Sequence, residues 1–104
     1  MAGHAISEAV KRAKVDPSEI DDVIVGAAAQ QGTQQGNIAR QSLLRAGLPT
    51  SVAGMSIDRQ CASGMMAIAT AAKQIIDDGM NVTVGGGVES VSLVRNENFR
   101  MDNA

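Results

Sequence analysis

The chain has 104 residues and a formal net charge of -2, and 44% of its residues are hydrophobic, which is typical of one modest globular domain. Its nine lysines and arginines are scattered and Phe99 is its only aromatic residue, so the composition does not favour nucleic-acid binding. No apolar stretch reaches the roughly 20 residues of a membrane-spanning helix. The N-terminal segment MAGHAISEAVKR lacks the uninterrupted apolar core of a secretory signal. A single cysteine cannot form an internal disulfide, so we expect a reducing, cytoplasmic location.

The N-terminal part of the sequence predicts a helix, a short turn and a strand. Residues 3–14 are expected to form an amphipathic helix, because their apolar residues recur at helical spacing. These apolar residues are Ile6, Ala9, Val10 and Ala13. The motif DPSE at 16–19 is typical of a helical turn with an aspartate N-cap and proline at its first position. The apolar, β-branched run DVIVGAAA at 22–29 predicts a strand buried on both faces.

The middle of the sequence predicts a loop, a second helix and a second strand. The polar, glycine-containing segment QQGTQQGN at 30–37 is typical of a loop. We expect a helix over 38–46, with Asn37 as its N-cap and Gly47 directly after its end. The segment SVAGMSI at 51–57 follows as a strand candidate.

The last part of the sequence predicts a long helix and a third strand. Helical spacing of apolar residues extends over 62–78, and Gly79 is placed to end this helix. Its polar stripe is narrow, so we expect most of its surface to be buried. The apolar residues expected in the core are Met65, Ile68, Ala69, Ala72, Ile75 and Ile76. The segment NVTVGGG at 81–87 predicts a strand that breaks into a glycine-rich bend. Alternating helices and apolar strands predict an α/β fold with a mostly parallel sheet.

Cys61 is the main candidate for a chemical role. A lone cysteine in an intracellular protein is most often a small buried apolar residue, so its presence alone does not indicate catalysis. Its position does, because Cys61 falls between a predicted strand and the start of a predicted helix. There the helix dipole and the free N–H groups favour a thiolate and can bind a developing oxyanion. The sequence offers no base, since its only histidine, His4, lies in the first helix, where a solvent-exposed role is expected.

Two features beside the predicted Cys61 helix have structural interpretations. Glycines 85–87 are not followed by the Lys-Ser/Thr signature of a phosphate-binding loop, so close backbone packing beside the helix is the better explanation. Glu89 and Ser90 can be imagined as a base and a hydroxyl partner. Structural hydrogen bonding near the site is the favoured interpretation of this pair.

The sequence resembles the thiolase family in three segments that stand in the family's order. DRQCASGMMAIATAAKQI, which contains Cys61, is similar to the thiolase segment in which the nucleophilic cysteine starts a buried helix. GGGVESVSL is similar to the glycine-rich strand end with its Glu-Ser pair, and residues 15–49 resemble the strand, loop and helix that come before. The resemblance implies a layered thiolase-type α/β fold with a buried central helix, and a partial N-terminal domain over residues 1–104.

The resemblance also implies a reaction. Thiolases transfer an acyl group between CoA thioesters through an acyl-cysteine intermediate, and Cys61 would be the nucleophile that carries the acyl group. The implied enzyme is an acyltransferase of fatty acid metabolism, either an acetyl-CoA C-acetyltransferase or a 3-ketoacyl-CoA thiolase. Acetyl-CoA or another acyl-CoA is the implied substrate, and no metal or other cofactor is expected. The backbone N–H of Cys61 would form one half of an oxyanion hole.

Two further assignments concern an interface and a pocket wall. Thiolases dimerise through the strand before the nucleophile, which implies a homodimer or homotetramer. The residues expected at this interface are Met55, Ser56, Ile57 and Asp58. Met65 lies about one helical turn after Cys61 and is a candidate for lining the acyl pocket, although filling the core is the simpler role for a methionine.

The sequence also departs from the thiolase pattern. The family begins with a central strand before the first helix, and its second half supplies a Gly-His-Pro histidine, an Asn-Glu motif and a second cysteine. The sequence has no second cysteine and no Gly-His-Pro, so we expect a partial thiolase whose first strand and second half are missing. Two alternatives stay open: a non-catalytic, truncated thiolase-like piece, or a segment of a related condensing enzyme that extends acyl-carrier-protein substrates.

Overall fold

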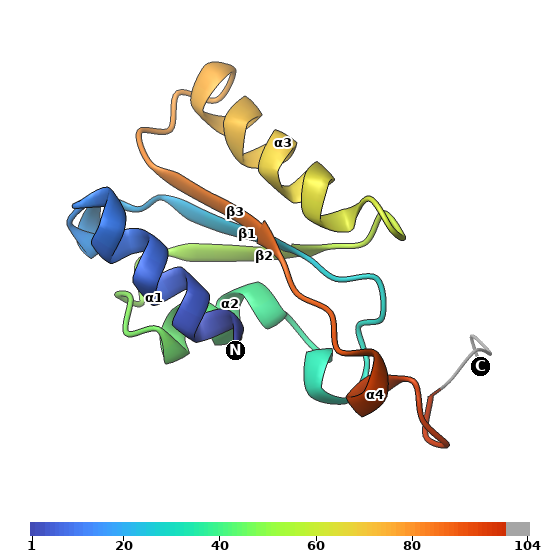
Figure 1. The fold of residues 1–104 in the computed structure, drawn as a ribbon. Helices are drawn as coiled ribbons and strands as arrows, with labels where there is room; N and C mark the ends of the chain where they lie inside the picture. Colours follow the sequence, from blue (N-terminus) through green and yellow to red (C-terminus); the bar gives the residue numbers. More distant parts are fainter. Residues whose placement is uncertain (100–104) are drawn as a thin grey trace.

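The computed structural model describes residues 1–99, so residues 100–104 of the expected domain lie outside the described residues. Within this part of the chain, three parallel strands form one sheet in the order β2–β1–β3. The strands are β1 (Asp22–Gly26), β2 (Ala53–Ile57) and β3 (Thr83–Gly87). Figure 1 shows helices α1 (Ala2–Ala13) and α2 (Ile38–Arg45) on one face of the sheet and α3 (Ser63–Ile76) on the other. The predicted α/β fold with a parallel sheet is confirmed.

Strand β1 is buried along its whole length because helices cover both of its faces. Its side chains alternate between two cores, as the two-residue period of a strand requires. Val23 and Val25 join the larger core, whose members from the two helices on that face include Ile6, Val10, Ala39 and Leu43. Ile24 joins the smaller core on the opposite face, with Ala67 and Ala71 of α3. The predicted burial is therefore right, although the strand ends at Gly26 and not at Ala29.

The local signals for helix ends act as predicted. The Asp16 carboxylate accepts the Ser18 N–H at 3.0 Å and begins the short helix η1 (Pro17–Glu19). The Asn37 side-chain oxygen accepts the Arg40 N–H at 3.0 Å and begins α2. Gly47 follows α2 with a φ of 88°, a left-handed conformation that glycine adopts without strain. Two further short helices, η2 (Gly32–Gln34) and α4 (Val91–Val94), were not predicted.

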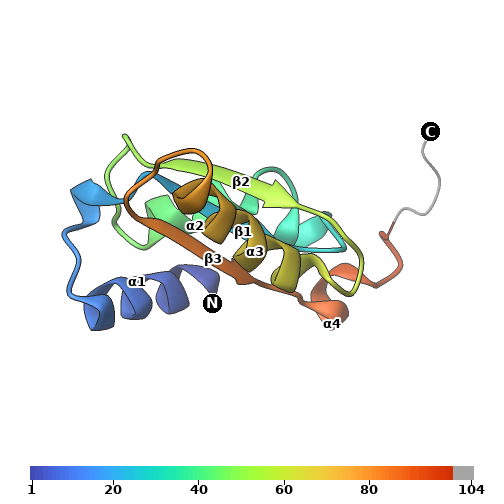
Figure 2. The same ribbon diagram turned by 90° about the horizontal axis from the view of Figure 1, so that it is seen from above.

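Helix α3 packs on the sheet through a different face from the one predicted. It runs along β1 and β3 (Figure 2), and its buried residues are Ser63, Ala67, Ala71 and Gln74. Within residues 1–99, all the apolar residues of α3 that were expected in the core are exposed. These residues are Met65, Ile68, Ala69, Ala72, Ile75 and Ile76.

Glycines in β3 explain this choice of face. Glycines 85–87 belong to the strand itself, so the predicted glycine-rich bend is also wrong. A Cβ atom added at Gly85 would lie 2.9 Å from the Cα atom of Ile68, which shows that α3 contacts the strand backbone directly. Such a close approach has room for alanine and serine between helix and sheet but not for large side chains. Among residues 1–99, no helix combines the length and the apolar character that crossing a bilayer requires.

Candidate functional site

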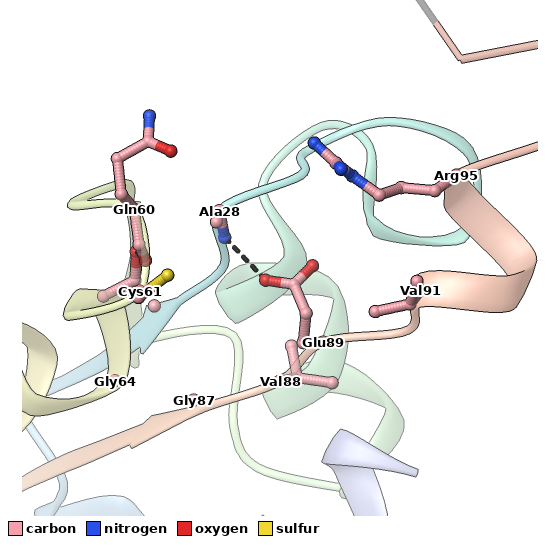
Figure 3. A pocket seen from close by; sticks show the side chains of 11 residues that line it. Ala28, Gln60, Cys61, Gly64, Gly87, Val88, Glu89, Val91 and Arg95 are labelled. Atoms are coloured by element: carbon pink, nitrogen blue, oxygen red, sulfur yellow. Dashed lines mark hydrogen bonds between the residues drawn. The ribbon is translucent and has the colours of Figure 1, made fainter.

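A pocket of about 610 Å³ opens at the carboxyl ends of the parallel strands (Figure 3). Strands β1 and β3 end there at Gly26 and Gly87, and α3 begins beside them. Crevices at this edge of a parallel sheet are the usual place for ligands in α/β proteins. The lining residues are Gly26, Ala28, Gln60, Cys61, Ser63, Gly64, Gly87, Val88, Glu89, Val91 and Arg95.

Two glycines allow α3 to begin in direct contact with the sheet. A Cβ atom at Gly26 would lie 2.2 Å from the carbonyl carbon of Ser63. A Cβ atom at Gly87 would lie 3.0 Å from the Cα atom of Gly64. Backbone therefore packs on backbone where the pocket begins, and the predicted close packing beside the Cys61 helix is confirmed.

The turn that carries Cys61 is held by hydrogen bonds of its own residues. Gln60 has a φ of 53°, a left-handed conformation that is uncommon for a residue other than glycine. The Asp58 carboxylate accepts the Gln60 N–H at 2.9 Å. The Ser63 hydroxyl accepts the Arg59 N–H at 2.7 Å and donates to the Gln60 carbonyl at 2.7 Å. Unusual backbone conformations of this kind persist only where the surroundings fix them, and they are frequent at functional sites.

Cys61 lies two residues before the first residue of α3, and its thiol is free and exposed. Figure 3 shows its sulfur directed into the pocket, toward Ala28. The predicted position between a strand and a helix is confirmed, whereas the predicted chemical role stays a prediction. Gly64, in the first turn of α3, also lines the pocket.

Several candidate residues lie away from this pocket. His4, the only histidine in the sequence, is exposed on α1 and is not part of the lining. Met65 also lies outside the lining, on the outer face of α3, where it is 77% exposed. Its role in an acyl pocket stays a prediction. The described residues contain no group of three or more histidine, cysteine, aspartate or glutamate residues that could hold a metal ion.

The residues predicted for a dimer interface lie on an edge strand and in the turn after it. Strand β2 pairs only with β1 in the described sheet, so its other edge carries unpaired backbone groups. Met55 on this strand is 38% exposed. The Ser56 hydroxyl is already used inside the chain, since it donates to the Asn37 side-chain oxygen at 3.1 Å. Contact with a second chain stays a prediction.

Glu89 faces the cysteine across the opening of the pocket (Figure 3). Its Oε1 atom accepts the Ala28 N–H at 2.9 Å, and its Oε2 atom accepts from Nε2 of Gln34 at 2.7 Å. Partial burial acts to raise the pKa of Glu89, but these hydrogen bonds, another from Ala29 and the charge of Arg95 outweigh it. The pKa therefore lies below its ordinary value, and the carboxylate is a poor proton acceptor. Structural hydrogen bonding, the interpretation favoured from the sequence, is confirmed for this residue.

Gln34 does not line the pocket, but it holds Glu89, and no sequence pattern predicted this role. Its side chain is only 2% exposed, and all of its polar atoms are hydrogen-bonded. Nε2 donates to the Ala29 carbonyl at 2.6 Å as well as to Glu89, and Oε1 accepts the Ser90 N–H. The sequence shows only a glutamine-rich loop there, and nothing distinguishes Gln34 from the neighbouring glutamines.

Comparisons with known proteins agree on one family. The family model described as "Thiolase, N-terminal domain" matches residues 1–102. A beta-ketoadipyl-CoA thiolase of Pseudomonas aeruginosa is 50% identical over 78 residues, which is 75% of this chain and 20% of that protein. The acetyl-CoA acetyltransferase of Escherichia coli K12 is 41% identical over 88 residues, which is 85% of this chain and 22% of that protein.

A solved structure gives the same result for the fold. The crystal structure of the Bacillus anthracis acetyl-CoA acetyltransferase matches with a TM-score of 0.77 and 43% sequence identity. The match covers 93% of this chain and 26% of that chain. The chain thus spans about a fifth to a quarter of the length of these proteins.

Proposed function

Because the chain belongs to the thiolase family, whose N-terminal domain model it matches almost throughout, we propose that it supplies the nucleophile of an acyltransferase acting on acyl-CoA thioesters. The nucleophile is Cys61. The observation that carries the proposal is the exposed thiol of Cys61 in a pocket at the start of α3. Small neighbours, among them Ala28 and Gly64, leave space for a thioester to approach the sulfur.

In the proposed reaction, the Cys61 sulfur attacks the carbonyl carbon of the acyl-CoA. The new carbon–sulfur bond forms, the bond to the CoA sulfur breaks, and the thiol proton is finally carried by the released CoA. N–H donors at the start of α3, among them the Cys61 N–H that the resemblance implies, and the helix dipole stabilise the negative charge that develops on the carbonyl oxygen. The acyl group then passes either to the carbon nucleophile of a second acyl-CoA or to CoA.

A base for Cys61 has to come from outside the pocket lining, which contains no histidine. The resemblance implies the histidine of a Gly-His-Pro motif, which this sequence does not contain. The complete reaction is therefore proposed for a polypeptide or assembly that supplies such a base. A reducing compartment such as the cytoplasm would keep the Cys61 thiol available for it.

We further propose acetyl-CoA as the acyl donor, and thus acetyl-CoA C-acetyltransferase as the specific activity. The E. coli and B. anthracis relatives are named acetyl-CoA acetyltransferases, and this supports the proposal. Larger acyl groups are the competing assignment. They are suggested by the names of the P. aeruginosa relative and of a Mycobacterium tuberculosis steroid 3-ketoacyl-CoA thiolase, which is 45% identical over 83 residues, 80% of this chain and 20% of that protein.

Mass spectrometry of the acyl intermediate tests the nucleophile assignment. The natural full-length polypeptide that contains these residues is incubated with acetyl-CoA, quenched in acid and digested. We expect an added acetyl group on the peptide that contains Cys61, and none on the same peptide of the Cys61→Ala variant. Acetylation of another residue with Cys61 unmodified would show that the assignment is wrong.

The second candidate function is that of a non-catalytic thiolase piece, and a pocket lining without a histidine favours it. Thiolysis of acetoacetyl-CoA by CoA separates the two candidates. Turnover that is lost in Cys61→Ala supports the enzyme. An acetyl group that accumulates on Cys61 without turnover supports the non-catalytic piece.

Homodimerisation through β2 is proposed from the resemblance and from the open edge of that strand. Sedimentation velocity of the parent protein and of the Met55→Lys variant tests it, because a lysine on an edge strand opposes strand pairing between chains. A dimeric parent with a monomeric variant is the expected result. A variant as dimeric as the parent would place the interface elsewhere.

A further inference from the structure

We propose that Gln34 and Glu89 form a clamp that positions the pocket wall facing Cys61, so that Glu89 is a positioning residue for acyl transfer and not its acid or base. This inference rests on the proposed function, because it assigns a task to the opposite side of the same pocket.

The backbone hydrogen bonds between the strands end just after Gly26, where the two walls of the pocket begin. The last backbone hydrogen bonds there join the Ala27 N–H to the Ile57 carbonyl at 2.9 Å and the Val88 N–H to the Gly26 carbonyl at 3.0 Å. Beyond these bonds, residues 28–34 and 89–95 leave the strands, and Ala28, Glu89, Val91 and Arg95 of these segments line the pocket. Their relative position then depends on side chains.

Hydrogen bonds cross between these two segments through Gln34 and Glu89. The Ala28 N–H and Nε2 of Gln34 both donate to the Glu89 carboxylate, and the Ser90 N–H donates to Oε1 of Gln34. A further bond, from Gln34 to the Ala29 carbonyl, fixes the glutamine to its own segment. Gln34 is the buried member of this network and all its polar atoms are hydrogen-bonded, so removal of Glu89 leaves a buried donor without its partner.

The same contacts argue against Glu89 as the base for Cys61. Both of its oxygens already accept hydrogen bonds, and its lowered pKa makes it a weak proton acceptor. Figure 3 shows the carboxylate turned toward the Ala28 N–H, across the opening from the cysteine sulfur. The geometry therefore gives Glu89 a holding role.

The clamp predicts a difference between two reactions of the same thiol. Acyl-CoA has to fit against the wall that carries Ala28, Val88 and Val91 before Cys61 can attack it. Iodoacetamide is a small, neutral alkylating reagent that needs only access to the thiol. Loss of the clamp should slow acetylation of Cys61 and leave its alkylation, and the pH profile of alkylation, unchanged.

The test is an exchange of the two functional groups in the natural full-length polypeptide. Glu89→Gln removes the charged acceptor, and Gln34→Glu places two carboxylates side by side. In the Gln34→Glu/Glu89→Gln double variant the amide and the carboxylate have changed places, so one amide–carboxylate hydrogen bond can form again. We expect each single variant to lose about tenfold in kcat/KM for acetyl-CoA, the factor for one hydrogen bond to a charged group. We expect the double variant to be faster than Gln34→Glu.

Two exposed positions provide matched controls. Glu19→Gln makes the same acid-to-amide change in η1, before β1 and away from the pocket lining. Gln35→Ala truncates the exposed glutamine beside Gln34. Both should acetylate like the parent. Urea unfolding of every variant gives the folded fraction, and each acetylation rate is divided by that fraction. If Gln34→Glu does not fold, the acetylation rate of Glu89→Gln alone decides whether the clamp is needed.

Three outcomes would overturn the proposal. Slower alkylation in Glu89→Gln, with a lost limb in its pH profile, would show that Glu89 acts as a base. A double variant no faster than Gln34→Glu would show that the two side chains do not act as a pair. Normal acetylation of Cys61 in Glu89→Gln would refute the clamp and leave the proposed function intact. If Cys61 is never acetylated even in the parent protein, the proposed function is refuted, and with it the task of the clamp.

Discussion

Replacing Gly26 with alanine places a methyl group 2.2 Å from the carbonyl carbon of Ser63 and 2.7 Å from the nitrogen of Gly64. Ordinary contact for a Cβ atom begins at 3.4 Å, so the start of α3 would have to retreat by about 1.2 Å. Overpacking of this kind costs roughly 1–3 kcal/mol. We expect the upper end of that range, because the opposing atoms belong to the backbone and cannot rotate away. Misplacement by 1 Å can also slow a reaction by about 100-fold, so acetylation of Cys61 should fall steeply.

The neighbouring strand provides the control for this substitution. Gly86→Ala makes the same change in β3 where no other atom lies within 4 Å, and Gly87→Ala is intermediate, with 3.0 Å to the Gly64 Cα atom. The free energy of unfolding in urea and the rate of Cys61 acetylation should both be lowest for Gly26→Ala, higher for Gly87→Ala and near the parent value for Gly86→Ala. Equal values for Gly26→Ala and Gly86→Ala would refute the argument that backbone contact sets the position of α3.

Three other substitutions test local features of the fold. Gln60 has a φ of 53°, which glycine adopts freely and valine does not. Gln60→Gly should therefore change the free energy of unfolding by less than about 1 kcal/mol, whereas Gln60→Val should lower it by about 1–2 kcal/mol more. Similar urea midpoints for the two variants would contradict this. Asn37→Ala removes the N-cap of α2 and should lower stability by about 1 kcal/mol in thermal unfolding, while Asn37→Asp keeps the cap and should cost less. Glu89 has a lowered folded-state pKa, so its contribution to stability is fully present above the ordinary value of 4.5 and is lost as the pH falls through the lower folded value. The stability difference between the parent and Glu89→Gln should therefore shrink on acidification below pH 4.5 in urea titrations, and a constant difference would disprove the assignment.

Elements whose signals are local could be predicted from the sequence. The N-caps at Asp16 and Asn37 act on residues two and three positions away, and both helices begin where these residues predict. The face of α3 that meets the sheet could not be predicted, because it is chosen by the partner surface. Glycines in β3 admit only small side chains such as that of Ala67, whereas helical periodicity reports the larger apolar residues.

In the candidate site, too, features with local signals could be predicted and features set by distant partners could not. The position of Cys61 followed from a strand pattern directly before it and a helix pattern directly after it, and the structure confirms that position. Gln34 could not be recognised, because it bonds to Glu89, a partner 55 residues away. A polar side chain in a polar loop carries no local sign that a distant carboxylate will accept its hydrogen bond.

Gly26, Ile57 and Gly87 are register partners in the parallel sheet, and the pocket begins directly after this row. One inserted or deleted residue inside a strand would move that strand's pocket residues by about 3.3 Å and turn its side chains to the opposite face. The opposite end of the sheet has no such constraint. Gly79, between α3 and β3, has a φ of 74° and open space around it, so added residues there would leave the row in place. A peptide tag or a fluorescent label for this domain therefore belongs at Gly79, where the length of the chain is free to vary.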